Sequence, residues 1–288
     1  MKKRILPILL VLCLMAGLTT VAFAAETGTD KIQLSGQRLY SEAYEVLEQV
    51  NAQRAENDLD PLVMDETLLE AAMLRAAECA VYFDHTRPDG SSCFTAASGW
   101  MNGENIAAGQ ANPTAAMNSW MNSSGHRANI LRDWFTTVGI GVFYINGVRY
   151  WTQCFGYRPS SVAVQPSNRA VTETINISPD LVTTFKLVLS STETDAGTSQ
   201  TAKVYVANSE FYNRLVPVES SSFRWSSSNA RVASVSNGTV KSLSGGTAVI
   251  TAATPNGVYS VSETITVTGT QNGWEQVDGK WYFYETAS

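Results

Sequence analysis

The stretch WMNSSGHRANIL, at residues 120–131, decides the fold of the first half of the chain. A short helix is expected to begin at Pro113, at a position where proline is tolerated, and to end near Met121, inside this stretch. A second short helix is expected over residues 125–131. Its histidine, His126, is one of only two in the 288-residue sequence, so the stretch carries side-chain chemistry as well as structure.

The other histidine, His85, opens the segment HTRPDG at residues 85–90. The order Pro-Asp-Gly favours a turn, so we expect a loop here. Between the two histidines lies the segment GENIA at residues 103–107, which supplies Glu104 and Asn105. These segments hold the candidate site residues.

Two longer helices are expected before this loop. The first has one apolar face that begins at Leu39 and reaches Val50 in steps of three and four residues. The second is expected from Asp65, whose side chain can cap its N-terminus, to about Tyr82. Its buried side is rich in alanine, which indicates close packing against another element.

A β-hairpin is expected after the helices. Apolar residues run from 138 to 144 and from 148 to 155, and they flank Asn146-Gly147, a dipeptide typical of tight hairpin turns. Helices followed by an antiparallel hairpin predict a layered α/β/α domain that ends near Tyr157.

Five groups of residues together resemble the CAP superfamily (SCP/PR-1-like proteins) in its short bacterial form. The resemblance spans residues 39–157 and implies a three-layer α/β/α domain, so the fold class expected for the first domain is α+β. The groups, in chain order, are VNAQR at 50–54 with LDPL at 59–62, HTRPDG at 85–90, GENIA at 103–107, WMNSSGHRANIL at 120–131 and YWTQCFG at 150–156.

The resemblance also implies a site. In the family, two histidines and two acidic residues converge in a central cleft that can bind a divalent metal. Three of these positions carry over, as His85, Glu104 and His126, whereas Ser123 stands at the position of the second acidic residue. Two imidazoles and a carboxylate suit zinc and leave one coordination position open. The expected ligand-binding cleft therefore consists of these four residues and Asn105.

Catalysis stays open at this point. A zinc-bound water would permit hydrolysis of peptides or cell-wall polymer, but Glu104 would be occupied as a ligand and Ser123 cannot abstract a proton at neutral pH. No catalytic residue is assigned. The alternative is that His85 and His126 are hydrogen-bonded residues that hold two loops over Glu104 without a metal.

The first 24 residues have the features of a secretory signal peptide. A basic start, an apolar run from Ile5 to about Gly17 and the small-x-small motif Ala22-Phe23-Ala24 occur in the expected order. The protein is therefore expected to be secreted and extracellular, and attachment to the cell wall is compatible with this destination. No later apolar run is long enough to span a bilayer.

Charge and cysteine content limit the remaining alternatives. The formal net charge is −6, and removal of the basic leader makes the chain more acidic, which argues against a nucleic-acid partner. Three cysteines remain, Cys79, Cys93 and Cys154. One pair of them can oxidise outside the cytoplasm, and the sequence does not choose which.

The rest of the chain is expected to contain a second domain. Residues 25–38 are polar and expected to be flexible, and residues 158–172 have the composition of a linker. Short β-rich runs over residues 173–269 predict an all-β sandwich. Through Trp225-Ser-Ser-Ser-Asn229 and Gly238-Thr-Val240 this region resembles a bacterial Ig-like domain of the second group.

Residues 270–288 are rich in aromatics and resemble the first half of a cell-wall or choline-binding repeat. That resemblance implies a cell-wall polymer or surface glycan as partner. The leading function hypothesis is an extracellular module whose cleft binds a small molecule or peptide, with the Ig-like domain as a spacer or adhesion unit. The alternatives are a metal-dependent hydrolase and a CAP domain that only serves as a scaffold.

Overall fold

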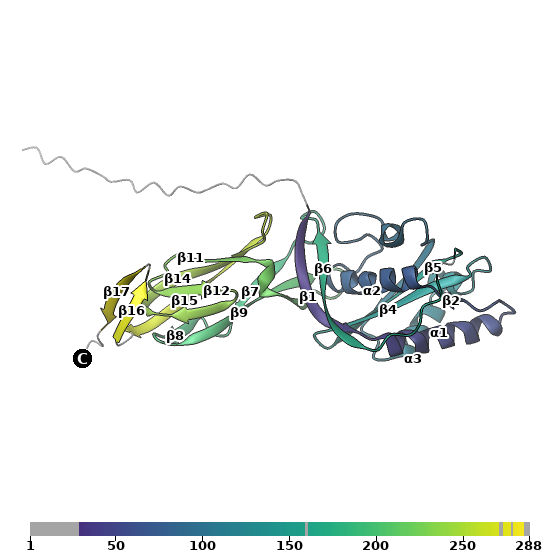
Figure 1. The fold of residues 1–288 in the computed structure, drawn as a ribbon, viewed down its shortest axis with the longest axis horizontal. Coiled ribbons are helices and arrows are strands. Elements are labelled where there is room, and N and C mark those ends of the chain that lie inside the picture. The colour runs from purple at the N-terminus through teal and green to yellow at the C-terminus, as the bar shows by residue number, and fades with distance from the viewer. Residues whose placement is uncertain (1–28, 159–160, 271–272, 278, 285–288) are drawn as a thin grey trace, which may run out of the picture.

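The computed structural model describes residues 29–158, 161–270, 273–277 and 279–284 (Figure 1). The expected signal peptide, residues 1–24, lies outside these ranges. Within them, no helix has both the length and the apolar character needed to cross a membrane.

The first part of the chain, residues 30–177, is a mixed α/β domain, called the α/β domain below. Its sheet has the strand order β3-β5-β4-β1-β6, with β2 paired to β4. The elements are β1 (Asp30–Arg38), α1 (Tyr40–Ala55), β2 (Val63–Met64), α2 (Glu66–Val81), η1 (Cys93–Ala97), β3 (Gly103–Ala108), α3 (Pro113–Met121), α4 (Ser124–Ile130), β4 (Thr137–Ile145), β5 (Val148–Gly156) and β6 (Arg169–Ile177).

The helices lie on both sides of this sheet. Helix α2 covers one side, and α1 and α3 lie on the other (Figure 1). Successive residues of β4 point to opposite sides of the sheet. Val138, Ile140 and Val142 pack with α1 and α3 on one side. Gly139 and Gly141 face the backbone of α2 on the other. The expected α/β layering is confirmed.

Local signals set the ends of several elements. The Asp65 side chain accepts a hydrogen bond from the backbone N–H of Leu68 at 3.0 Å and so caps α2 as expected. The turn between β4 and β5 is formed by Asn146 and Gly147, both with positive φ, as the sequence predicts.

Two expectations about connecting segments are wrong. Residues 30–38, expected to be flexible, form β1, and residues 169–172, expected to belong to a linker, begin β6. The two strands pair antiparallel over nine residue pairs, and alternate side chains such as Ile32 and Leu34 are buried. Pairing with a partner more than 130 residues away stabilises both segments, so the second domain does not begin at residue 173.

The second part of the chain, residues 185–270, is called the β-rich region. One sheet has the order β10-β9-β13-β12, with β7 on β9, and another has the order β11-β14-β15-β8. The strands are β7 (Phe185–Leu189), β8 (Glu193–Asp195), β9 (Ser199–Asn208), β10 (Arg214–Val218), β11 (Arg224–Ser227), β12 (Ala233–Ser236), β13 (Thr239–Ser242), β14 (Ser244–Ala253) and β15 (Ser260–Thr270). The β-rich character is confirmed, whereas the Ig-like type stays a prediction.

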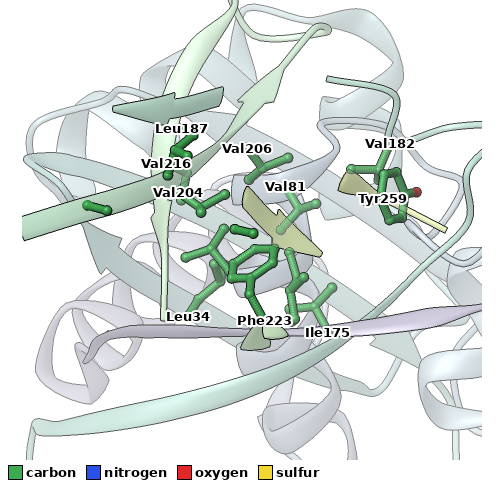
Figure 2. Packing of buried hydrophobic residues seen from close by; sticks show 14 of the residues in the cluster. Leu34, Val81, Ile175, Val182, Leu187, Val204, Val206, Val216, Phe223 and Tyr259 are labelled. Atoms are coloured by element: carbon green, nitrogen blue, oxygen red, sulfur yellow. The ribbon is translucent and has the colours of Figure 1, made fainter. Parts of the chain in front are cut away.

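The two parts share one hydrophobic core. A single cluster of buried residues joins α2, β1 and β6 to the inner face of the β-rich region, as Figure 2 shows. Residues labelled there include Leu34, Val81 and Ile175 from the α/β domain and Val204, Val216 and Phe223 from the β-rich region. Beyond them, β16 (Gly273–Val277) and β17 (Lys280–Tyr284) form a separate two-stranded sheet.

Candidate functional site

The loop after α2 and the first residues of β3 bring His85 and Glu104 together. His85 Nδ1 donates to Glu104 Oε2 at 2.7 Å. The Glu104 side chain is only 2% exposed, whereas that of His85 is 56% exposed. A buried carboxylate therefore fixes an imidazole that is itself more than half exposed to solvent.

A cleft of about 610 Å³ lies beside this pair. The η1 region supplies Cys93 and the exposed ring of Phe94, β3 supplies Glu104, and α4 supplies Asn129. The complete lining is His85, Thr86, Gly90, Ser92, Cys93, Phe94, Asn102, Gly103, Glu104 and Asn129. The cleft thus combines hydroxyl, amide and imidazole groups with one aromatic ring.

Helix α4 places His126 near this cleft but outside its lining. His126 is half-buried, and burial lowers the pKa of its imidazole, with a further lowering by the positive charge of His85. The two histidines are therefore close enough to influence each other. Ser123 stands just before α4, where its carbonyl accepts the Arg127 backbone N–H at 2.9 Å, and it too lies outside the lining.

Asn105 holds α4 against the sheet. Its Nδ2 donates to the His126 carbonyl at 3.0 Å and to Gln153 Oε1 at 2.9 Å, and its Oδ1 accepts from Asn129 Nδ2 at 2.9 Å. The side chain is fully buried, so these bonds satisfy most of its polar groups. Asn105 is a structural link behind the cleft and not a residue of its wall.

A buried row of alternating charges lies behind Glu104, and no sequence motif indicated it. Arg75 Nε donates to Glu104 Oε1 at 2.8 Å, and Arg75 Nη1 donates to Glu78 Oε2 at 2.8 Å. Glu78 in turn accepts from Arg87 Nε at 3.0 Å. Arg75 and Glu78 interrupt the alanine-rich face of α2 three residues apart, which is the signal that could have found them.

The hydrogen bond to Glu104 raises the pKa of His85 above its ordinary value, against the opposing effect of burial. Burial, reinforced by the charge of Glu104, raises the pKa of Cys93 to about 11. Burial also raises the pKa of Cys79 to about 12. The cleft therefore holds a histidine whose pKa is raised beside the Cys93 thiol, which keeps its proton.

Cys79, Cys93 and Cys154 are all buried and unpaired. The disulfide that the sequence left open among them is not formed. The three thiols instead contribute to packing around α2 and β5.

The expected zinc ligands do not fit a metal site in this arrangement. Both oxygens of Glu104 are already engaged, one by Arg75 and one by His85, and the guanidinium supplies the positive charge that a metal would bring. Across the ranges that the structure describes, no group of three or more His, Cys, Asp or Glu side chains is arranged to hold a metal ion. We therefore derive no step through zinc.

Comparison with known proteins agrees with this architecture. Residues 47–155 match the family described as the cysteine-rich secretory protein family, CAP. Residues 47–155 form a CAP domain. It lies within the α/β domain, and the cleft, the two histidines and Glu104 all belong to it.

Bacterial relatives share the CAP domain. The chain is 41% identical over 122 residues to the uncharacterized protein YkwD of Bacillus subtilis (strain 168), a match that covers 39% of this chain and 47% of that protein. The chain thus spans about half the length of this curated relative.

Two solved structures are also similar. An extracellular protein with an SCP domain from Bacillus anthracis str. Ames is 27% identical, with a TM-score of 0.37 over 41% of each chain. An outer surface protein from Borrelia burgdorferi is 16% identical, with a TM-score of 0.38 over 43% of this chain and 98% of that one.

Proposed function

We propose that this protein is an extracellular binding module whose CAP cleft takes a polar ligand, a short peptide or a glycan fragment. The observation that carries the proposal is the His85–Glu104 pair at the wall of the 610 Å³ cleft. A buried carboxylate that orients a half-exposed imidazole is a preorganised hydrogen-bonding group for a ligand.

The charges behind the cleft favour an uncharged polar ligand over an ion. Arg75 and Arg87 are matched by Glu78 and Glu104, so the row of buried charges is balanced. Hydroxyl and amide groups on the lining offer hydrogen bonds, and the exposed ring of Phe94 offers a stacking surface. Peptide main chain and sugar hydroxyls both meet this description.

The hydrolase alternative receives less support from the same contacts. Glu104 would have to serve as metal ligand or base, yet its two oxygens bind Arg75 and His85. Cys93 lies in the cleft wall, but its pKa of about 11 keeps the thiol protonated and weakly nucleophilic.

The decisive experiment follows the two imidazole signals by NMR while wall-derived muropeptides or a pool of short peptides are added. We expect shifts at His85, and we expect His85→Ala to weaken binding by about tenfold, since a ligand hydrogen bond contributes about 1.4 kcal/mol or more. His126→Ala is the comparison variant, because His126 lies outside the lining but close enough to His85 to affect its charge. Its affinity should fall less than that of His85→Ala.

Equal loss of affinity in both variants would refute the assignment of the cleft. Loss of binding on addition of a chelator would instead support the metal hypothesis. Cleavage of the peptides by the wild type, and not by His85→Ala, would favour the hydrolase.

We propose further that the C-terminal strands attach the protein to a cell-wall polymer or surface glycan. Strand β17 presents Trp281 and Phe283, 64% and 51% exposed, two residues apart and therefore on one face. Exposed aromatic rings of this kind stack on sugars. Co-sedimentation with purified cell walls should fall in Trp281→Ala, with Trp134→Ala, at another exposed tryptophan, as the control.

A further inference from the structure

Asn208, the last residue of β9 in the β-rich region, reaches into the CAP domain. Its Nδ2 donates to the carbonyls of Cys79 at 2.8 Å and Ala80 at 3.1 Å, in the last turn of α2. Its Oδ1 accepts the backbone N–H of Phe83 at 3.4 Å. The side chain is fully buried, so a residue of the second domain satisfies the end of a helix in the first.

The loop that follows α2 carries His85, and its far end is also bonded to a residue outside the CAP domain. The backbone N–H of Ser178 donates to the carbonyl of Pro88 at 2.8 Å. Phe211, which follows Asn208 in the β-rich region, packs its ring against Phe83, with centroids 5.7 Å apart, and against Tyr150. The segment 83–88, which carries His85, is therefore held at both ends by residues beyond the CAP domain.

We propose that the β-rich region is a positioning element of the CAP cleft, with Asn208 as the residue that holds the His85 loop where the imidazole meets Glu104. The inference rests on the proposed binding function for its significance. Its geometry rests on the contacts of Asn208 and Phe211, which both belong to the β-rich region. The second domain is then part of the site and not only a spacer.

Contacts within the loop, contacts with α2 and contacts from outside the CAP domain fix the loop. His85 is half-exposed, and its side chain bonds Glu104. Within the loop, the Cys93 N–H donates to the His85 carbonyl at 3.1 Å, and the Arg87 N–H donates to the Ser91 carbonyl at 2.8 Å. These bonds shape the loop. Arg75 Nη2 donates to the Asp84 carbonyl at 2.8 Å and Arg87 pairs with Glu78, so α2 holds the loop from within the CAP domain. Asn208 and Ser178 hold it from outside.

The test compares Asn208→Ala with Ser222→Ala in the full chain. Ser222 is a matched control, because its buried Oγ also spans the interface and accepts the Gln33 N–H of β1 at 2.8 Å, away from the loop. Two readouts at one fixed pH are needed, hydrogen exchange of the amides in residues 83–93 and the ¹⁵N signal of the His85 imidazole.

For Asn208→Ala we expect exchange in residues 83–93 to accelerate at least tenfold, with β4 and β5 unchanged, and the His85 signal to move toward that of a free imidazole. Ser222→Ala should change neither. The proposal would be overturned if amide exchange in residues 83–93 of Asn208→Ala were as slow as in the wild type. It would also be overturned if this exchange accelerated equally in both variants. If Asn208→Ala does not fold, the same two readouts are measured on Phe211→Ala, because the Phe211 ring is only partly buried and its loss is easier to tolerate.

These readouts need no ligand, so the two proposals fail separately. An unchanged loop together with binding that depends on His85 would refute the positioning role and leave the binding function in place. If the loop is loosened in Asn208→Ala but the protein binds none of the tested ligands, the positioning role stands and the binding function is refuted.

Discussion

At the scale of single residues, Arg75 organises the site. It is fully buried and bonds two carboxylates and the Asp84 carbonyl. A buried ion pair contributes little when it is complete, but removal of one partner leaves an uncompensated charge in a medium of low polarity. Here one substitution would leave both Glu78 and Glu104 without their central partner.

Arg75→Ala should therefore lower the free energy of unfolding by about 3–5 kcal/mol. The matched control is Arg149→Ala, because Arg149 bonds Glu42 in a more exposed pair, and that change should cost about 1 kcal/mol or less. Urea unfolding of both variants measures the difference. Similar losses in the two variants would contradict the central role of Arg75.

The His85–Glu104 pair should make stability depend on pH. The pKa of His85 is raised in the folded protein, so the pair's contribution is complete below the ordinary imidazole pKa of about 6.5 and is lost as the pH rises through the raised value. His126, whose pKa is lowered, acts in the opposite sense, since its proton favours the unfolded chain.

The measurement is made on variants that carry His126→Ala, so that the opposing contribution of His126 to the pH dependence is absent. The stability difference between that variant and one that also carries His85→Gln should be larger at about pH 5.5 than at about pH 8.5. A difference that is constant with pH, or larger at high pH, would show that His85 does not hold its proton through Glu104.

Sequence motifs pointed to His85 and Glu104, which line the cleft, because each stands in a distinctive local segment. They did not reveal Arg75, because its partner Glu104 lies 29 residues away and on another element. They also did not separate Asn105, Ser123 and His126 from the lining residues, since a position in the chain does not determine whether a side chain reaches the cleft wall.

At the scale of elements, the contact of α2 with β4 brings two backbones unusually close. A Cβ added at Gly139 would overlap the backbone of Leu68, and one added at Gly141 would overlap the backbone of Ala72. The alanine-rich face of α2 and the two glycines of β4 therefore work together to bring a helix backbone against the sheet.

Gly139→Ala and Gly141→Ala should each destabilise the protein by about 3 kcal/mol or more, because a methyl group there must push α2 away from the sheet. Gly125→Ala is the control, since Gly125 lies in α4 with open space around it, and it should be neutral or stabilising by up to about 1 kcal/mol. Thermal unfolding monitored by circular dichroism measures all three. Equal stability would contradict the close packing.

The sequence predicted helices and the β4–β5 hairpin well, because periodicity and an Asn-Gly turn are local signals. It missed β1 and β6, although Ile32 and Leu34 alternate with polar neighbours. These strands pair with each other across more than 130 residues. A short alternating run between polar segments does not indicate a partner so distant in the sequence.

At the scale of the whole molecule, the shared core predicts that both parts unfold together. The cluster includes Leu34 and Ile175 on one side and Val204 and Val216 on the other (Figure 2). Scanning calorimetry should show one transition for residues 30–270, with equal calorimetric and van't Hoff enthalpies. Two separate transitions would show that the α/β domain and the β-rich region are independent.

The pairing of β1 with β6 has a mechanical consequence. Asp30 lies opposite Ile177, so the two points where the chain leaves the α/β domain are neighbours. Tension applied through the preceding and following chain would open this ladder one rung at a time from that end. The residue after Ile177, Ser178, donates its N–H to the Pro88 carbonyl of the His85 loop. Tension on the chain after β6 would therefore act on this loop as soon as it acts on the first pair of the ladder, so the cleft would respond to force before the domain unfolds.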